Sequence, residues 1–466
     1  MRHPLLARFF VVLSLVVFLL VPLQMIRGVI DERAARRAAA LAEVASTWGA
    51  AQTLVGPVVV VPFQVERKES WVDPAVSPGA PHGGAVRERT RVDVEQATFL
   101  PDTLKVEGRL VPDRRWRGIF EVVVYRTELA VSGTIPAPDL GPLGVPPEDV
   151  HWKDAFLSVG LSGTRGIREE VRLLWDGAPV GFRPGLGAAC LAPSGIHAPL
   201  IALEGTGALS HKFAFTLTLQ GTEALAVTPL GATTEAVLRS PWPSPSFFGA
   251  FLPDRRTVTP EGFDATWKVS SFGRSYPQRW RGDQAARGDA VAKSAFGVRL
   301  FLPADAYQQA TRALKYAILF VGLTFLAFAL FETFSGLRIH PLQYLFVGFA
   351  LVLFYLLLVS LSEHVGFGAA YLAAASATTL LVSSYCAWVL AAKTRALVMA
   401  AALAALYGYL FVLLRLEDYA LLLGSVALFA LLAALMLATR RVDWWSVGGP
   451  GRPPTSFQPP LPRTSP

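Results

Sequence analysis

Cysteine is almost absent from this chain of 466 residues, which contains only Cys190 and Cys386. Cys386 lies within an apolar segment, so we do not expect it to pair with Cys190. Neither a disulfide framework nor a cysteine-based zinc site is therefore predicted. The seven histidines lie far apart in the sequence and form no local metal-binding pattern. We predict no metal and no other cofactor.

Charge is also scarce. Only 17% of the residues are charged and 52% are hydrophobic, whereas a typical soluble domain has about 25% charged residues. The apolar residues concentrate in one run near the N-terminus and in a block after residue 313. The composition therefore indicates a membrane protein with a soluble insert. The net charge of +8 includes no long Lys/Arg block interleaved with aromatics, so we expect no nucleic-acid partner.

The common catalytic signatures are missing as well. The sequence has no HExxH, no Walker loop and no GxSxG, so zinc proteases, P-loop enzymes and seryl hydrolases lack their local motifs. A catalytic triad assembled from distant positions stays open. We therefore predict that the chain is not an enzyme, and keep a membrane-anchored hydrolase as an alternative.

Six apolar runs are long enough to cross a bilayer, which takes about 20 residues. The first covers residues 9–26 and has no small-residue cleavage site close behind it. We interpret it as an uncleaved signal anchor rather than a signal peptide. The other five runs follow residue 313: Leu314–Thr333, Leu342–Leu361, Phe367–Ala391, Ala396–Leu414 and Tyr419–Ala438.

The basic residues set the expected orientation. With the N-terminus in the cytoplasm, the short outer loops hold only Arg415, beside two acidic residues. This satisfies the positive-inside rule, and predicts that both termini are cytoplasmic. The basic residues that then fall inside are Arg2, Arg8, Arg338, Lys393, Arg395, Arg440 and Arg441.

Small residues predict close helix packing. The run that contains "AAYLAAASATTLLVSSYCAW" is rich in Ala, Ser and Thr, and small residues let helices approach closely. We therefore expect this helix to be central to the bundle, unless the composition merely reflects a high alanine content. Gly348 and Gly408 are candidates for the same role.

Residues 27–312 form the soluble insert. It opens with an amphipathic helix from Asp31 to about Gln52, which we expect to continue the first span outward. The hydrophobic period then changes to two, which predicts roughly ten strands in an antiparallel sandwich or sheet pair. The clearest strands are Gly56–Val65, Phe120–Gly133, His211–Gly221 and Phe263–Ser271.

The predicted organisation therefore has four parts. They are a transmembrane helix (1–26), a β-rich domain (27–312), a five-helix transmembrane bundle (313–441) and a disordered Pro-rich tail (442–466). We also expect exposed loops at Asp73–Ala85 and Pro136–Pro147.

Two aromatic-rich stretches are candidate ligand or partner surfaces. "SPWPSPSFFGAFLPD" contains Trp242 between prolines, which exclude a central strand. "RSYPQRW" alternates arginines with aromatics, a combination that can hold an anionic glycan or lipid headgroup. Packing into the core is the alternative for both stretches. The candidate residues are Trp242, Arg274, Tyr276, Arg279 and Trp280.

Glu363 and His364 lie side by side at the outer end of the third span. We expect them to form an interfacial contact with Arg312 or Lys315, which lie near the outer end of a helix that enters the bilayer continuously from the soluble domain. A pH-sensitive role is the alternative, because histidine titrates near neutrality. His340 lies at the opposite end of the same predicted helix, ~36 Å from His364, so the two histidines cannot share a site.

Several stretches together resemble the CreD family of bacterial inner-membrane proteins. They include "STWGAAQTLVGPVVVVP", "WRGIFEVVVY", "SPWPSPSFFGAFLPD", "RSYPQRW", "YQQATRALKYAILFVGLTFLAFALFE" and "HPLQYLFVGFALVLFYLLLVSLSEHVGF". The resemblance implies a large periplasmic domain and a role in cell-envelope integrity and envelope-stress response. It supplies no catalytic residues.

The leading hypothesis is thus a non-enzymatic envelope protein. Its partners would be the lipid bilayer and an envelope protein, peptidoglycan or lipid, while the sequence leaves the oligomeric state open. A transporter or lipid-handling protein is an alternative. It is weakened because the five C-terminal spans carry no Asp, Glu, Lys or Arg near their centres, where such residues usually mark function.

Overall fold

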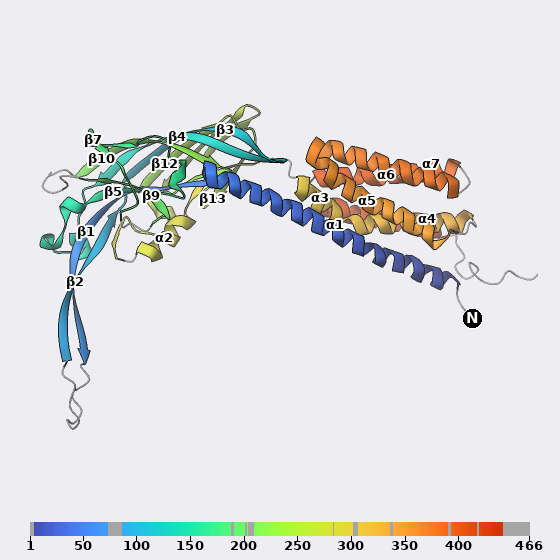
Figure 1. Ribbon diagram of the computed structural model, residues 1–466, viewed down its shortest axis with the longest axis horizontal. Coiled ribbons are helices and arrows are strands. Elements are labelled where there is room, and N and C mark those ends of the chain that lie inside the picture. Colours follow the sequence, from blue (N-terminus) through green and yellow to red (C-terminus); the bar gives the residue numbers. More distant parts are fainter. Residues whose placement is uncertain are drawn as a thin grey trace, which may run out of the picture. The chain divides into compact units, whose positions relative to one another are not determined.

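The computed structural model of the chain divides into two compact units. We call residues 1–36 and 304–466 the helical unit and residues 37–303 the β unit. Figure 1 shows both as a ribbon coloured along the chain. The structure describes residues 4–72, 86–187, 191–200, 203, 209–282, 284–301, 306–335, 339–389, 393–416 and 419–440.

Every apolar run predicted to span the membrane is helical. The first run lies within a 45-residue helix, α1, which confirms that the predicted outer helix continues the first span. Four of the five later runs each correspond to one helix, whereas the run Leu314–Thr333 extends over two. The helices are α1 (Pro4–Trp48), α3 (Ala306–Lys315), α4 (Ala317–Ser335), α5 (Pro341–Val365), α6 (Phe367–Val389), α7 (Lys393–Arg415) and α8 (Ala420–Thr439).

By length and composition, four helices in the described residues can each cross a membrane: α1, α5, α6 and α7. The pair α3 and α4 gives a fifth candidate span if it is taken as one, with a bend of 44° at the break. The prediction of one continuous helix at the entry to the bundle is therefore wrong. Helix α3 is strongly amphipathic, whereas α4 is apolar on all sides. The helix axis therefore bends at the point where the chain changes from an amphipathic to a wholly apolar helix.

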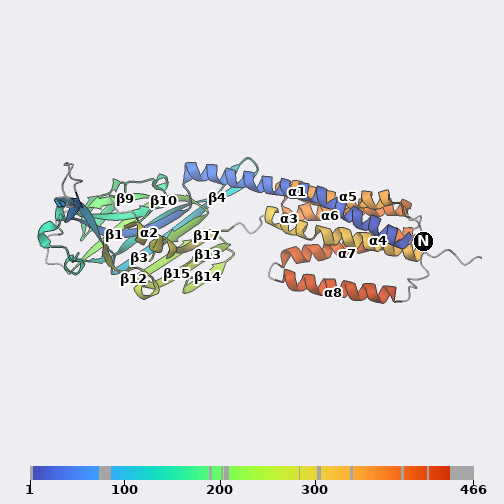
Figure 2. The same cartoon turned by 90° about the horizontal axis from the view of Figure 1, so that it is seen from below.

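Helix α5 is the most buried of the candidate spans. In its most apolar stretch 56% of the residues are buried, against 28% for α6. Helix α5 packs on α3, α4 and α6, and α7 packs on α6 and α8 (Figure 2). The alanine-rich helix α6 packs between α5 and α7, so the predicted close approach of its neighbours is found, although α5 is the more buried of the two helices.

Gly348 confirms the predicted close approach of helices. A Cβ at this position would lie 2.3 Å from Leu19 Cδ1 of α1 and 3.0 Å from Phe325 Cζ of α4. Leu19 is fully buried there. A Cβ at Gly408 meets nothing within 4 Å, so the same prediction for Gly408 is wrong.

These two glycines give a matched test of helix packing. We expect Gly348→Ala to lower the stability of the detergent-solubilised chain by about 1–3 kcal/mol through overpacking. Gly408→Ala should be neutral or stabilising by up to ~1 kcal/mol, because alanine favours a helix over glycine. Thermal unfolding of both variants measures the difference, and equal melting temperatures would contradict the packing assigned to Gly348.

The β unit contains seventeen strands in its described residues, more than the roughly ten predicted, together with helix α2 (Gln284–Lys293). The strands are β1 (Gln52–Val72), β2 (Val86–Phe99), β3 (Thr103–Arg117), β4 (Phe120–Pro136), β5 (Phe156–Leu161), β6 (Arg172–Trp175), β7 (Ala178–Gly181), β8 (Arg183–Pro184), β9 (Ser194–Pro199), β10 (Ser210–Thr222), β11 (Ala224–Val227), β12 (Thr233–Ser240), β13 (Pro245–Gly249), β14 (Arg255–Thr259), β15 (Gly262–Ser270), β16 (Arg279–Arg281) and β17 (Phe296–Leu300).

The strands form two sheets. The eight-stranded sheet has the order β14-β15-β12-β3-β4-β10-β6-β7. The nine-stranded sheet has the order β13-β17-β11-β1-β5-β9-β8, with β2 beside β1 and β16 beside β2. Most pairs are antiparallel, as predicted. The pairs β1–β11 and β3–β12 are parallel, so both sheets are mixed.

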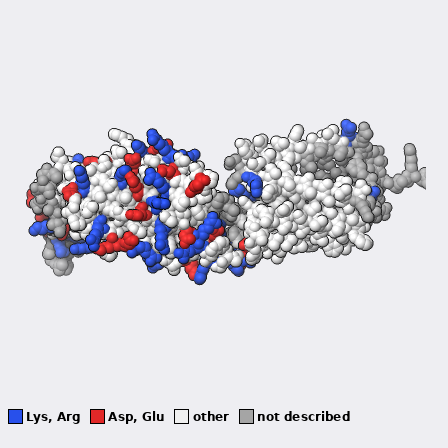
Figure 3. Space-filling view, turned by 90° about the horizontal axis from the view of Figure 1, so that it is seen from above, with Lys and Arg blue, Asp and Glu red and all other residues white. Residues whose placement is uncertain are grey.

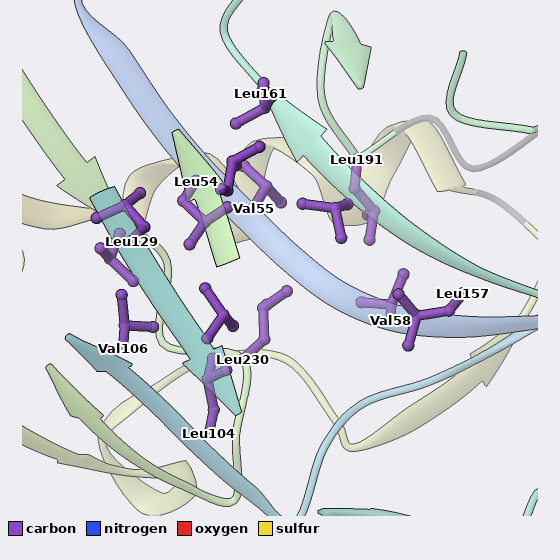
Figure 4. Packing of buried hydrophobic residues seen from close by; sticks show 14 of the residues in the cluster. Leu54, Val55, Val58, Leu104, Val106, Leu129, Leu157, Leu161, Leu191 and Leu230 are labelled. Atoms are coloured by element: carbon purple, nitrogen blue, oxygen red, sulfur yellow. The ribbon is translucent and has the colours of Figure 1, made fainter. Parts of the chain in front are cut away.

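One hydrophobic core joins the two sheets, as expected for a sandwich. In Figure 4, Leu54 lies near Leu129 of the other sheet, Leu104 lies beside Leu230, and Leu157 lies beside Val58. All of these side chains are buried, and burying each such side chain contributes roughly 1.5–3 kcal/mol. The nine-stranded sheet supplies Leu54 and Leu157, and the eight-stranded sheet supplies Leu104 and Leu129.

The alternation of β3 explains how one strand has both a buried and a polar face. Leu104 and Val106 are buried, while Lys105, Glu107 and Arg109 are exposed. Alternate side chains of a strand point to opposite faces of the sheet. The outer face of the eight-stranded sheet is consequently polar.

The predicted loops and tail have different outcomes. Pro136–Pro147 contains one short 3-10 turn and begins another, η1 (Gly141–Leu143) and η2 (Pro147–Asp149). The loop Asp73–Ala85 and the tail from residue 442 lie outside the described residues.

Candidate functional site

Glu363 joins three helices of the helical unit. Its Oε1 accepts a hydrogen bond of 2.9 Å from the Tyr307 hydroxyl on α3. Its Oε2 lies 3.6 Å from Nη1 of Arg33 on α1. Glu363 itself belongs to the last turn of α5. We call Arg33, Tyr307 and Glu363 the Glu363 junction.

The position of the junction in the chain is informative. Arg33 lies just before residue 37, where the chain passes into the β unit. Tyr307 lies just after residue 303, where the chain returns. The carboxylate of Glu363 therefore contacts α1 four residues before the β unit begins, and contacts the first turn of α3 soon after the β unit ends.

The environment of Glu363 requires these contacts. Its side chain is only 9% exposed, and the Tyr307 residue is equally buried. A carboxylate withdrawn from water is costly unless it is hydrogen-bonded or paired. The Tyr307 hydroxyl is a buried hydrogen-bond donor to the carboxylate. The Arg33 side chain is 38% exposed and contributes a positive charge that remains partly hydrated.

His364 has a different environment from Glu363 despite being its neighbour. It is exposed, and the described residues include no hydrogen-bond or ion-pair partner for it. The adjacent acid and imidazole therefore point to different surroundings, because consecutive residues of a helix lie about 100° apart around its axis.

The described contacts of Glu363 are with residues other than Arg312 and Lys315, for which the expected contact stays a prediction. The hydrogen bond and ion pair of Glu363 come from Tyr307 and Arg33. Lys315 is exposed near the end of α3. In the sequence, Tyr307 belongs to the apolar repeat of the helix, one turn before Thr311. That pattern predicts packing of its ring and gives no sign that its hydroxyl donates a hydrogen bond.

A second tyrosine–glutamate contact lies near the other end of α5. The Tyr344 hydroxyl donates to Glu332 Oε2 of α4 at 3.2 Å. There α5 begins with a capping box, in which His340 Nδ1 accepts from the Leu342 amide and the Gln343 side chain accepts from the His340 amide. These residues were not among the predicted candidates.

The junction predicts unequal coupling energies. Tyr307 and Glu363 should couple by about 1.5–3 kcal/mol, the usual range for a hydrogen bond to a charged group. Arg33 and Glu363 should couple by only about 0.2–1 kcal/mol, because the arginine is partly solvated. Double-mutant cycles with Tyr307→Phe, Arg33→Ala and Glu363→Ala in detergent measure both values.

His364→Ala is the matched control for these cycles. It removes an ionisable group one residue away and should change stability by less than about 0.5 kcal/mol. A loss as large as that of Glu363→Ala would show that the end of α5, rather than the junction, determines the stability.

The predicted ligand surface is largely buried. Trp242, Tyr276 and Trp280 are 4–5% exposed and belong to the hydrophobic core. Trp242 donates to the Phe301 carbonyl at 3.1 Å, and the Tyr276 hydroxyl donates to the Pro229 carbonyl at 3.1 Å. This placement favours the packing alternative for the aromatic residues. As expected, the Pro-rich stretch provides no central strand, since β13 lies at a sheet edge.

The two arginines of that set differ from each other. Arg274 is partly buried and stacks on Tyr276, with its guanidinium carbon 4.5 Å from the ring centre. It also donates to the Gly231 carbonyl and to Gln278. Arg279 is exposed and lies 3.8 Å from Asp139. Of the five candidate residues, Arg279 alone is assigned to the exposed surface.

The outer end of α1 is bound to the β unit by polar contacts. Glu43 forms a bidentate ion pair with Arg117 of β3. Trp48 donates to the Tyr125 carbonyl, and the Arg115 guanidinium lies 4.6 Å from its ring centre. The last turns of α1 are therefore an integral part of the β unit.

Hydroxyl groups inside the helical unit are surrounded by aromatic rings. Tyr371 of α6 donates to the Tyr407 carbonyl of α7 at 2.7 Å, and Phe354 of α5 contacts both rings. This close packing does not support a polar transport path. The described residues also contain no group of three His, Cys, Asp or Glu side chains suited to a metal ion.

Comparison with known proteins agrees with these features. The family model described as "Inner membrane protein CreD" matches residues 4–445. The chain belongs to the CreD family. It is 34% identical to the inner membrane protein CreD of Escherichia coli (strain K12) over 457 residues, which cover 97% of this chain and 96% of the relative. The resemblance inferred from the sequence motifs is thereby confirmed, as is the inner-membrane character.

Proposed function

We propose that this member of the CreD family is a non-enzymatic inner-membrane protein that supports cell-envelope integrity and the envelope-stress response. Its β unit would lie in the periplasm and contact an envelope component, while its helical unit anchors it in the bilayer. The observation that carries the proposal is the Glu363 junction, because it gathers both connections to the β unit at one buried carboxylate.

The distribution of charge supports this division. Figure 3 shows a face of the helical unit with very few charged residues, whereas the β unit carries Lys, Arg, Asp and Glu throughout. A bilayer accepts the first surface and water the second. With α8 and the bent pair α3–α4 each counted as a span, six crossings would put both termini on the same side of the membrane, and the positive-inside rule favours the cytoplasm.

The junction would then act as a mechanical link. Forces or ligands acting on the β unit reach the membrane through the segments that carry Arg33 and Tyr307, and both are held by Glu363. Transport is the weaker alternative, because the described contacts of the helical unit form packing rather than a path.

A fusion experiment tests the topology. Alkaline phosphatase joined after residue 200 should be active, because it folds only in the periplasm, whereas green fluorescent protein joined after residue 440 should fluoresce in the cytoplasm. Swapping the two reporters is the control and should abolish both signals. An inactive phosphatase after residue 200 would overturn the periplasmic placement.

Complementation tests the role of the junction. In cells that lack their own copy, the parent chain should restore survival under envelope stress such as detergent. Glu363→Ala should reduce this rescue at an unchanged protein level, and His364→Ala should not. Full rescue by Glu363→Ala would remove the junction from the function.

A further inference from the structure

The outer face of the eight-stranded sheet carries a groove made of two adjoining cavities. Their volumes are about 880 and 690 Å³. Arg109, Glu128 and Ala130 line both, so the cavities are continuous across β3 and β4. The first extends over β10 and β6, and the second over β12, β15 and β14.

The floor of the groove is low because its central side chains are small. Ala130 and Ser132 of β4 lie beside Ala214 and Thr216 of β10. Exposed strand positions usually carry bulkier side chains. A ligand can therefore approach the sheet closely along this line.

A row of charges crosses the floor at right angles to the strands. The strand register places Asp264, Arg239, Arg109 and Glu128 opposite one another in turn on β15, β12, β3 and β4. Neighbouring strands lie about 4.8 Å apart. Arg239 is neutralised by Asp264, with Nε 2.6 Å from Oδ2.

Arg109 and Glu128 are the unusual members of this row. They face each other across β3 and β4, yet neither has a hydrogen bond or ion pair with its side chain among the described residues. Arg109 also has a second arginine, Arg239, directly opposite it on the other side. Like charges in cross-strand positions repel each other, so an anionic group bound between the two arginines would offset that repulsion.

The whole lining indicates a ligand with both signs of charge. Because arginines and carboxylates are both present along it, a surface of one charge sign, such as an anionic glycan polymer or an anionic lipid surface, fits it less well. The arginines are Arg109, Arg126, Arg172 and Arg239, and the acids are Glu107, Glu128, Glu169, Glu170, Glu261 and Asp264.

We propose that this groove binds the peptide portion of the cell wall, a short extended peptide with free carboxylates and a free amine. A carboxylate would lie between Arg109 and Arg239, and the amine beside Glu128. The proposal rests on the periplasmic placement above and names the envelope component that the β unit contacts. A folded protein partner fits less well, because interface centres are rich in aromatic and apolar side chains, and here charged and small residues dominate.

Co-sedimentation with insoluble peptidoglycan sacculi tests the proposal on the full-length chain in detergent. The parent chain should pellet with sacculi. Arg109→Ala and Glu128→Ala should each weaken binding about tenfold, which corresponds to ~1.4 kcal/mol, and should keep the parent melting temperature. Lys268→Ala is the matched control, since Lys268 is exposed on the same face of β15 and lines neither cavity.

The arms of the experiment separate the possible ligands. Sacculi stripped of their peptides by an amidase should no longer bind. Retained binding to the bare glycan, or binding to anionic lipid vesicles that Arg109→Ala abolishes, would overturn the proposal. So would failure of the parent chain to pellet. Because these assays use purified protein, their outcome is independent of the reporter fusions that test the topology.

Discussion

Helix α1 belongs to both units of the chain, and its side chains must pack in the helical unit at one end and in the β unit at the other. The rest of the structure depends on this continuous helix. Helix α1 buries Leu19, Leu23, Ile26 and Ile30 against the helical unit. Its last turns instead use Glu43 and Trp48 for polar contacts with the β unit. A helix satisfies its own backbone hydrogen bonds in either medium. The change of partner is therefore made entirely by side chains, and the backbone continues without interruption.

The return connection solves the same problem differently. Between α3 and α4 the chain bends by 44°, and an amphipathic helix gives way to one that is apolar all round. The Glu363 carboxylate lies where it can bind both connections, through Arg33 on α1 and Tyr307 on α3. A buried carboxylate that accepts one hydrogen bond and forms one ion pair, with partners on different helices, fixes their spacing more specifically than apolar contacts do, because loss of a partner leaves the buried charge poorly compensated.

In the β unit, the pleat of the strands separates the residues that form the core from those that face outward. In β3, alternate residues such as Leu104 enter the core while Arg109 faces outward. The buried half of each strand holds the sandwich together, so the outward half can carry charges whose pairing is incomplete. Incomplete pairing is costly in a core but inexpensive at a surface, and it leaves Arg109 and Glu128 available to a ligand.

The sequence by itself determined the elements whose signal is local. Apolar length identified the helical runs, and a period of two identified strands such as β4 and β10. The glycine at position 348 also predicted a close approach of helices, because glycine has no Cβ to hold them apart. Tertiary structure alone decided the rest. The burial of Trp242 and Trp280, the partners of Glu363 and the alignment of Arg109 with Arg239 all depend on residues far apart in the chain. Sequence spacing does not encode such contacts, since sheet register and helix packing bring them together only when the whole core forms.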